Sequence, residues 1–463
     1  MTHFQRPAWR TRVSLLASLA LLVSCGGDGS LSPAPAPATQ PPSLMLSGVT
    51  VNKFRASRNE WGVLTERLQP LVDKTAPDRD LLLSAGGGQP QSVDLPQGWS
   101  LIDFALHPSG EISLVLATDT QLRLQRRGSD GRLIADMTLT DPEAPTDPFI
   151  GNSTPVTDPQ SLVPLGTRDA VHLAPVGEDL LIAYRTGLNA VIAQRLTYNG
   201  GADFERRWRT IVEPGVPIDR IRLTSGTFDP FGSLDNQWQL VLDVDPQGRS
   251  AIAVSLGGTD LPKGHSEYFS EPLDPALVSG AMVTMLDANG HRVGATPVDT
   301  GVISEVHAVR WAGDSILVAG RMRTTLREDG GGWDGYLARV NPVNRTTQLQ
   351  ALDFDRGDVI LDLAPLDDGR IAIAGSTAYV QNPTGASISE TAEPLLAMLP
   401  ATPGPAQRLP LPAGPRHNQV RTVAAWLQGW VIGGLQNGPG THSADSNPTL
   451  LTCDGFLQAQ NFQ

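Results

Sequence analysis

The sequence contains little cysteine, lysine or aromatic residue, and each shortage excludes a class of protein. Two cysteines, Cys25 and Cys453, are too few for a disulfide framework. Charged residues make up 18% of the 463 residues, and the net charge of −13 opposes binding to a phosphate backbone. The three lysines form no polybasic segment that would hold anionic lipid. The composition therefore predicts no nucleic-acid partner and no disulfide-stapled fold.

Glycine and proline are abundant, with 47 and 38 residues. Together they exceed the roughly 12% that average proteins contain. The apolar content of 40% is nevertheless ordinary, so the chain can bury a core. A long chain with many turns and a normal core is typical of repetitive β structure.

The N-terminal segment has the pattern of a targeting signal. Residues 1–12 are basic, and residues 13–23 are apolar apart from two serines. This apolar run is shorter than the roughly 20 residues that span a bilayer, but it fits the h-region of a secretory signal. It ends in Leu22-Val23-Ser24-Cys25, which resembles the lipobox of bacterial lipoproteins. An ordinary cleaved signal peptide that happens to contain a cysteine is the alternative.

The lipobox resemblance implies a location. Residues 1–24 would be the signal peptide, and Cys25 would become the lipidated N-terminus, anchored in the cell envelope by its acyl chains. Gly26 stands where an aspartate would resemble an inner-membrane retention signal, which favours the outer membrane. Residues 25–44 are rich in Pro, Ala and Gly and read as an extended tether. The expected partner at this end is therefore the membrane, reached through lipid.

The remaining chain repeats one pattern, a β run, a turn with glycine and a second β run. It occurs six times between residues 97 and 463. The turn glycines are Gly110, Gly177, Gly248, Gly313, Gly369 and Gly429. Glycine is expected there because tight hairpins need positive φ angles.

Each hairpin is followed by a weaker third run and often a further turn. Four short strands per repeat are typical of the blades of a β-propeller. Residues 45–96 have about the length of one blade, with a possible short helix at 59–72, and would form a partial or closing blade. The expected fold is therefore all-β, a β-propeller of six or seven four-stranded blades over residues 45–463.

Leu361-Asp-Leu-Ala-Pro-Leu-Asp-Asp-Gly-Arg-Ile-Ala-Ile-Ala-Gly375 resembles a short bacterial propeller repeat of the form D-x-A-x-x-x-D-G-x-I-x-x-A-G. Asp103 and Asp362 both lie seven residues before their turn glycine. The resemblance implies a propeller, in which the first strand of each blade lines a central channel. Because propellers include enzymes and scaffolds, it implies little about function.

Polar residues in or beside the six first strands are candidates for lining that channel. They are Asp103, His107, His172, Glu305, His307 and Asp362. The histidines lie at different distances from their turn glycines, so the pattern predicts no three-histidine metal site. No metal or other cofactor is expected. The simpler interpretation is that these side chains bond to neighbouring backbone and water.

The sequence contains no G-x-S-x-G, H-E-x-x-H, C-x-x-C or P-loop motif. Two long acidic, proline-rich segments, 141–167 and 257–278, exceed what a hairpin needs and indicate loops that contact partners. These features favour a lipid-anchored binding or scaffold module for protein or glycan partners. The alternative is an envelope hydrolase or lyase with its site at the channel mouth.

Overall fold

The computed structural model describes the parts of the chain in which strands form. The described residues are 43–57, 60–67, 79–85, 88–118, 121–139, 171–185, 191–201, 203–213, 240–255, 280–302, 304–324, 332–384, 387–402, 404–426, 429–438 and 453–461. Cys25, residues 26–42 of the tether and both long acidic segments, 141–167 and 257–278, lie outside them. No helix in the described ranges is long and apolar enough to cross a membrane.

Five separate antiparallel sheets of four strands follow one another along the described chain. The first contains β2 (Val49–Ser57), β3 (Glu60–Arg67), β4 (Arg79–Ser84) and β5 (Gln91–Ser92). The second contains β6 (Ser100–Leu106), β7 (Ile112–Ala117), β8 (Leu122–Arg127) and β9 (Leu133–Leu139). The third contains β10 (Val171–Val176), β11 (Asp179–Arg185), β12 (Val191–Tyr198) and β13 (Phe204–Glu213).

The fourth and fifth sheets repeat this order. The fourth contains β14 (Leu240–Val244), β15 (Ser250–Ser255), β16 (Gly280–Leu286) and β17 (Arg292–Asp299). The fifth contains β18 (Ser304–Ala312), β19 (Ser315–Arg323), β20 (Trp333–Asn341) and β21 (Thr346–Leu352). In each sheet the strands pair in chain order, so every blade is an up-and-down meander.

The last strands join the N-terminal strand in one eight-stranded sheet. Its members are β22 (Val359–Pro365), β23 (Ile371–Thr384), β24 (Ser387–Leu399), β25 (Gln407–Arg408), β26 (His417–Trp426), β27 (Gly429–Gly438), β28 (Asp454–Asn461) and β1 (Leu44–Ser47). Thus five blades stand alone among the described residues, where the sequence predicted six or seven. The difference arises because β24 and β26 meet through one parallel pair, Ala392 with His417, which fuses two groups of strands.

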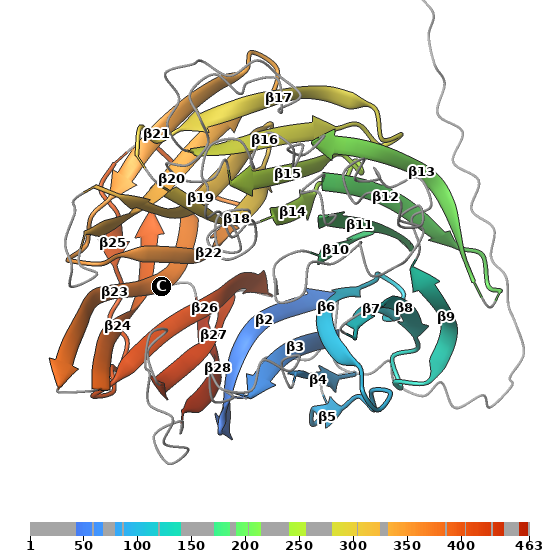
Figure 1. The fold of residues 1–463 in the computed structure, drawn as a ribbon, viewed down its shortest axis with the longest axis horizontal. Coiled ribbons are helices and arrows are strands. Elements are labelled where there is room, and N and C mark those ends of the chain that lie inside the picture. Colours follow the sequence, from blue (N-terminus) through green and yellow to red (C-terminus); the bar gives the residue numbers. More distant parts are fainter. Residues whose placement is uncertain are drawn as a thin grey trace, which may run out of the picture. The chain divides into compact units, whose positions relative to one another are not determined.

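The first strands of the sheets form a closed circuit within the described chain (Figure 1). β2 contacts β6, β6 contacts β10, and the series continues through β14, β18, β22 and β26 back to β2. The N-terminal strand β1 pairs with the C-terminal strand β28 from Leu44–Leu457 to Ser47–Asp454. This pairing covers the edge of β28 and ties the two ends of the circuit together. Residues 45–96, which the sequence analysis predicted as a partial or closing blade, contain most of β1 and all of β2 to β5.

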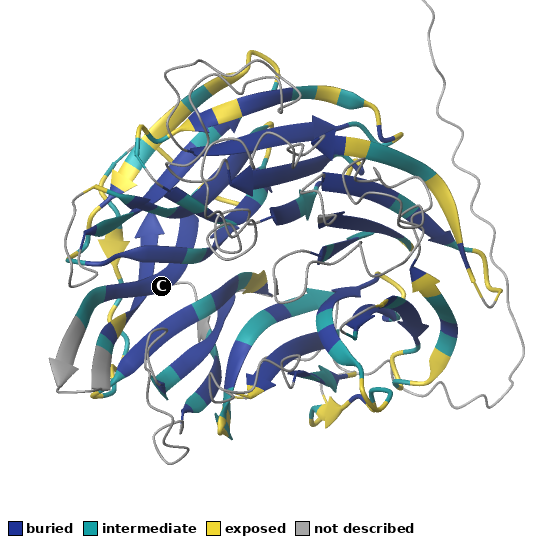
Figure 2. Ribbon diagram, viewed as in Figure 1, coloured by how far each residue is buried: buried dark blue, intermediate teal, exposed yellow. Residues whose placement is uncertain are grey.

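Seven apolar clusters lie between neighbouring groups of strands. The described core residues of each cluster come from two adjacent groups, as Leu124 of β8 and Leu173 of β10 do in one of them. Another cluster joins β2 and β3 to β27 and β28, which closes the series. Buried residues dominate the inner and middle strands, and exposed residues gather on outer strands such as β13, β17 and β21 (Figure 2). Each sheet therefore depends on both neighbours for burial.

The hairpin turns confirm most of the glycine prediction. Five of the six predicted turn glycines, Gly110 through Gly369, adopt positive φ angles between 60° and 86°. Gly429 differs, because it is the first residue of β27 and pairs with Trp426.

The helix predicted at residues 59–72 was wrong over its described part. Residues 60–67 form β3, which pairs with β2 on one side and β4 on the other. The local pattern of Trp61, Val63 and Leu64 suits either structure. Pairing on both sides decides it, because tertiary contacts override weak local propensity.

A β-bulge recurs in the first strand of several blades. In β18, β22 and β26 the register shifts by one residue, and a glycine on the second strand, Gly320, Gly375 or Gly434, pairs with the residue before the bulge. A Cβ atom on Gly375 would lie 1.8 Å from the carbonyl oxygen of Val359. The closing glycine of the repeat motif is therefore required by the close approach of the bulged strand.

This requirement can be tested with Gly375→Ala. We expect the variant to lose about 1–3 kcal/mol of unfolding free energy, because the added methyl group must displace backbone. Gly201→Ala is the control, since nothing lies within 4 Å of the added atom and no positive φ opposes it. It should change stability by less than about 0.5 kcal/mol. Equal urea midpoints for the two variants would contradict this account of the motif.

Candidate functional site

The recurring bulge sets which side chains reach the axis of the circuit. The residue that resumes pairing after the bulge is Lys53 in β2, Asp103 in β6, Asp362 in β22 and Thr422 in β26. In β18 the same position holds Ala308, and the residue two positions later is Arg310, equivalent to Arg55 of β2. We call Lys53, Arg55, Asp103, His172, Asp243, Arg310 and Asp362 the axial cluster.

Asp103 is the most heavily bonded member of the axial cluster. Its carboxylate lies 2.8 Å from Lys53 Nζ and 3.3 Å from Arg55 Nη2, and His172 Nδ1 is 3.7 Å away. It also accepts the backbone N–H groups of Phe104 and of Leu173 in the next blade. Burial alone would raise the pKa of Asp103, but Lys53, Arg55 and His172 outweigh it and hold the pKa well below its usual range. Asp103 is therefore an ionised carboxylate on β6 that bonds to both β2 and β10 and so holds the three strands together.

Asp362 repeats this arrangement on the other side of the circuit. Arg310 Nη2 donates to its Oδ1 at 2.6 Å, as Arg55 donates to Asp103. Its Oδ2 accepts the backbone N–H of Val423 in the next strand group at 3.1 Å. Thr422, at the equivalent position in β26, accepts the N–H of Phe54 through its hydroxyl oxygen. The same position thus joins neighbouring blades three times over.

Asp243 is a member of the axial cluster on β14, whose pairing with β15 shows no register shift. The sequence analysis did not place it among the channel candidates. Its Oδ2 accepts the backbone N–H of Trp311 at 2.8 Å, which again ties one blade to the next. Burial raises the pKa of Asp243 above its usual value, against the opposing influence of Arg310 and Arg55.

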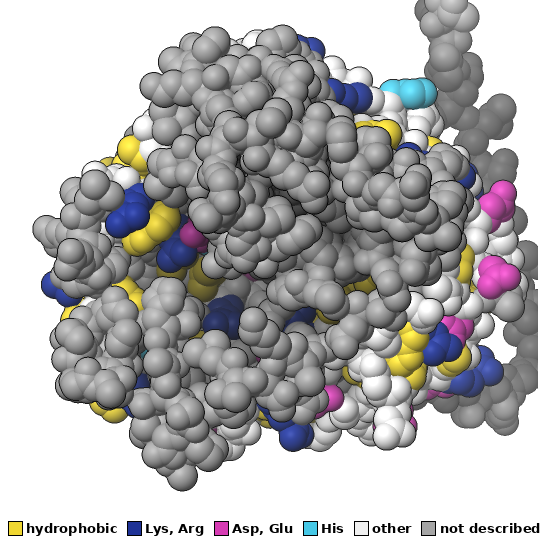
Figure 3. Space-filling model, in the orientation of Figure 1, with side chains coloured by type: hydrophobic (Ala, Val, Ile, Leu, Met, Phe, Trp, Pro, Cys, Tyr) yellow, Lys and Arg dark blue, Asp and Glu magenta, His cyan; other side chains and the backbone are white. Residues whose placement is uncertain are grey.

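In the ion pairs of the axial cluster, the cationic side chains are more exposed than the aspartates that they contact. The side chains of Lys53, Arg55 and Arg310 keep 30%, 22% and 33% of their surface, whereas Asp103 keeps 1% and Asp362 11%. Figure 3 shows Lys and Arg side chains within the hollow near the centre of the viewed face. Arg55 and Arg310 also lower the pKa of Lys53, on top of the larger effect of its burial. The three cations are thus close enough to repel one another.

The predicted channel residues fall into three groups. Asp103, His172 and Asp362 belong to the axial cluster. Glu305 and His307 form a second group, in which Arg321 Nη2 lies 2.7 Å from Glu305 and His307 Nε2 lies 3.5 Å from it. His107 belongs to a third. The structure therefore does not bring all six residues to one point.

His107 is part of a buried network between β6, β8 and the β10–β11 turn. Its Nδ1 lies 3.1 Å from the carbonyl oxygen of Gly177, and its Nε2 lies 2.8 Å from Ser113 Oγ and 3.2 Å from Arg126 Nη1. Because a carbonyl only accepts and a guanidinium only donates, Nδ1 carries the proton and the ring is neutral. Burial, with help from Arg126, lowers the pKa of His107 to about 4.

His417 at the start of β26 is also held neutral. It is 3% exposed, packs edge-on against Tyr379, and neither ring nitrogen has a hydrogen-bond partner among the described residues. Burial lowers the pKa of His417 to about 4. A folded-state pKa below the unfolded value of about 6.5 costs no stability above pH 6.5, and stability is lost as pH falls towards 4.

We expect His417→Phe to reduce the acid lability of the protein. The wild type should lose about 2 kcal/mol through this group between pH 7 and pH 5, and the variant should not. At pH 8 the variant should be at least as stable, because no hydrogen bond to the ring is lost. Urea unfolding at pH 5, 7 and 8 measures the difference. A wild type and variant with parallel pH profiles would contradict this assignment.

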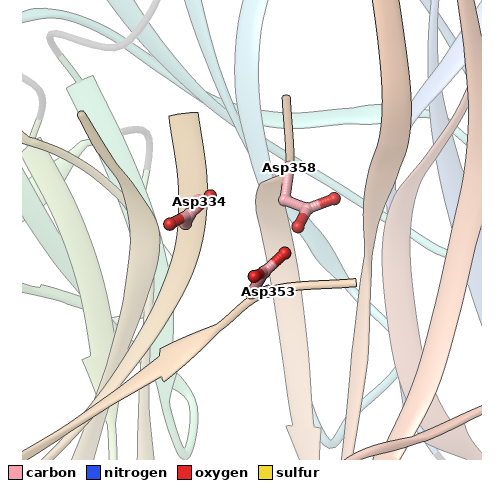
Figure 4. A group of neighbouring side chains, drawn as sticks. All are labelled: Asp334, Asp353 and Asp358. Atoms are coloured by element: carbon pink, nitrogen blue, oxygen red, sulfur yellow. The ribbon is translucent and has the colours of Figure 1, made fainter. Parts of the chain in front are cut away.

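Three carboxylates outside the axial cluster lie close enough to share a cation. One oxygen each from Asp334, Asp353 and Asp358 falls within 4.8 Å of the others (Figure 4). Burial raises the pKa of Asp358 to about 6 although it accepts hydrogen bonds from Phe354 N, Asp355 N and Thr377 Oγ1. Oxygen ligands suit Ca²⁺ or Mg²⁺. The sequence analysis predicted no cation site from these residues, since they come from β20 and the β21–β22 connection and meet only in the fold.

A pocket of about 560 Å³ opens between the β14–β15 and β18–β19 turns. It is lined by Asp245, Pro246, Gln247, Arg249, Trp311, Gly313 and Asp314. Arg249 is stacked over the Trp311 ring at 4.6 Å and is bonded to Asp245, so the aromatic face is already covered.

Comparisons with known proteins add the fold and no family. No family model matches the chain, and no curated protein matches it. Among solved structures, the polysaccharide lyase Uly1 is similar with a TM-score of 0.45 and 9% identity, over 89% of this chain and 90% of that one. The WD40 β-propeller domain of Doa1 has a TM-score of 0.44 and 10% identity, over 89% and 95%.

A prolyl endopeptidase structure has a TM-score of 0.43 and 12% identity. The match covers 84% of this chain but 45% of the endopeptidase chain. These proteins have different activities, and their likeness to this chain is one of fold. The sheets of the described chain and the circuit of their first strands make the fold an all-β propeller with four-stranded blades.

Proposed function

We propose that this protein is a non-enzymatic binding module of the cell envelope that holds a protein or glycan partner at its axial cluster. One observation carries the proposal. The partly exposed cations Lys53, Arg55 and Arg310 lie over carboxylates that are bonded to backbone N–H groups of the next blade. Those carboxylates already bond to the backbone of the next blade, whereas the cationic side chains keep exposed surface that a partner could contact.

The binding itself is tested with the purified full-length protein on a glycan array and by crosslinking in intact cells. We expect a specific glycan or envelope protein to be retained. A protein that retains neither, yet cleaves a glycan, would contradict the proposal.

We also propose that the module is lipid-anchored, on the strength of Leu22-Val23-Ser24-Cys25 and the Pro-rich tether after it. Cys25→Ala should abolish palmitate labelling and release the protein from the membrane fraction, because two acyl chains anchor stably where none remains. The control is Cys453→Ala, whose thiol is buried in the fold. Continued labelling and membrane retention of the Cys25 variant would rule out the anchor.

We propose seven blades, with the eight-stranded sheet counted as two. One apolar cluster packs β22–β24 against β26–β28, as the other clusters pack separate sheets, and the first strands make a circuit of seven. The single Ala392–His417 pair joins β24 to β26 at one position only, whereas the apolar cluster extends over several strands on each side.

The alternative is an envelope hydrolase or lyase, and one observation favours it. The axial cluster contains two aspartates whose pKa values are displaced in opposite directions, Asp103 downward and Asp243 upward. Such a pair suits general acid and base roles. Asp243→Asn would abolish turnover of a glycan substrate if the alternative holds, and would leave partner retention intact if the binding proposal holds.

A further inference from the structure

We propose that the axial cluster binds the carboxylate of a small ligand through Lys53, Arg55 and Arg310. This inference rests on the proposed function and names the chemistry that the site recognises. The ligand would be a sugar acid or another organic acid, and its carboxylate would enter between the first strands.

The cations retain donors for such a group. Lys53 Nζ bonds to Asp103 alone, and Arg55 uses only Nη2, which contacts Asp103 and the carbonyl oxygen of Leu173. Arg310 uses Nη1 and Nη2, for the carbonyl of Val309 and for Asp362. The other N–H groups of these three side chains have no acceptor in the described part of the chain. Guanidinium and ammonium donors match the two oxygens of a carboxylate.

The three cations converge although they come from two distant strands. Lys53 and Arg55 lie on β2, and Arg310 lies on β18. Hydrogen bonds connect them. Arg310 Nη2 and Thr422 Oγ1 both donate to Asp362, and the Thr422 hydroxyl oxygen accepts the N–H of Phe54, which lies between Lys53 and Arg55 in β2. An anion placed among them relieves the repulsion between like charges that burial otherwise strengthens.

The charge balance favours a monoanion over a dianion. Asp103, Asp243 and Asp362 lie among the three cations, so the charges of the cluster nearly cancel when all are ionised. Burial raises the pKa of Asp243, against the opposing influence of Arg310 and Arg55. The carboxylates of the cluster would repel a phosphate dianion more strongly than a single carboxylate.

The test is calorimetric titration of the full-length protein with D-galacturonate, acetate, galactose and inorganic phosphate at pH 7 and low salt. We expect galacturonate and acetate to bind and galactose not to bind, with phosphate weaker than either. If galacturonate binds more tightly than acetate, the site recognises a sugar acid. If the two bind equally, the site recognises only the carboxylate. Both follow from the proposal. Absence of carboxylate binding, equal binding of galactose, or tighter binding of phosphate would overturn it.

Variants locate the site. Lys53→Gln and Arg310→Gln should each weaken galacturonate binding at least tenfold, and Arg310→Lys should weaken it less because it keeps the charge without the fork. Arg123→Gln is the matched control, since Arg123 pairs with Asp136 on the outer strands β8 and β9 with a similar exposure of 30%. Thermal melting shows which variants fold. If Arg310→Gln does not fold, Arg310→Lys decides, and unchanged affinity in a folded variant overturns the inference.

The inference and the proposed function can fail separately. If the protein binds a carboxylate but retains no glycan or protein, the carboxylate site is supported and the proposed function is contradicted. If a partner is retained equally well by wild type, Lys53→Gln and Arg310→Gln, the proposed function is supported and this binding site is contradicted.

Discussion

Asp103→Ala is expected to lower the free energy of unfolding by about 3–5 kcal/mol, because it leaves buried charge without its partner. The substitution removes the one carboxylate that Lys53 Nζ bonds and that lies nearest Arg55 and His172. It also strips the acceptor from two backbone N–H groups, those of Phe104 and Leu173. Asp103→Asn should lose less, since its oxygen can still accept one of them.

The control for this prediction is Asp136→Ala on β9. Asp136 also pairs with an arginine, but its side chain is 22% exposed and lies on the outer strands. Such pairs contribute about 0–1 kcal/mol. Urea unfolding at pH 7 measures all three variants. Similar losses for Asp103→Ala and Asp136→Ala would show that Asp103 does not staple the blades.

Deletion of residues 415–463 should abolish cooperative folding. It removes β26, β27 and β28, which supply one side of two apolar clusters and the strand that pairs with β1. The flanks of β22–β24 and of β2–β3 would then face water, and exposed apolar faces with open strand edges aggregate.

Size-exclusion chromatography and a thermal melt followed by circular dichroism measure this outcome. We expect aggregate and no sharp transition. A soluble monomer with a cooperative melt would show that the sheets fold as separate domains, which would contradict the closed circuit.

The hairpins and their glycines could be predicted from the sequence because both depend on local chemistry. A positive φ at Gly110 or Gly369 is required by the turn, whatever lies around it. The number of separate sheets could not be predicted, since it depends on one parallel pair between Ala392 and His417. The strand at Glu60–Arg67 was mistaken for a helix because its apolar spacing suits both structures, and only its pairing with β2 and β4 decides between them.

The axial cluster was only partly predictable for a related reason. Asp103 and Asp362 share a spacing from their turn glycines, and this spacing survives in the fold as equivalent positions after a bulge. Arg55 and Arg310 are equivalent too, but a bulge of one residue changes which side chains face inward, and the sequence does not show where it occurs. Lys53 precedes a turn without glycine, and Asp243 lies five residues before Gly248, as His172 lies before Gly177, so the spacing of Asp103 and Asp362 picks out neither Lys53 nor Asp243.

The central claim is that the cations of the axial cluster hold the partner. Partner retention by the Lys53→Gln/Arg310→Gln double variant, compared with wild type and Arg123→Gln, tests this claim most directly. The account predicts that the double variant is less stable than wild type, because Asp103 and Asp362 each lose a cation, but still unfolds in one thermal transition and loses the glycan or protein that wild type and Arg123→Gln retain. Undiminished retention by the folded double variant would contradict it.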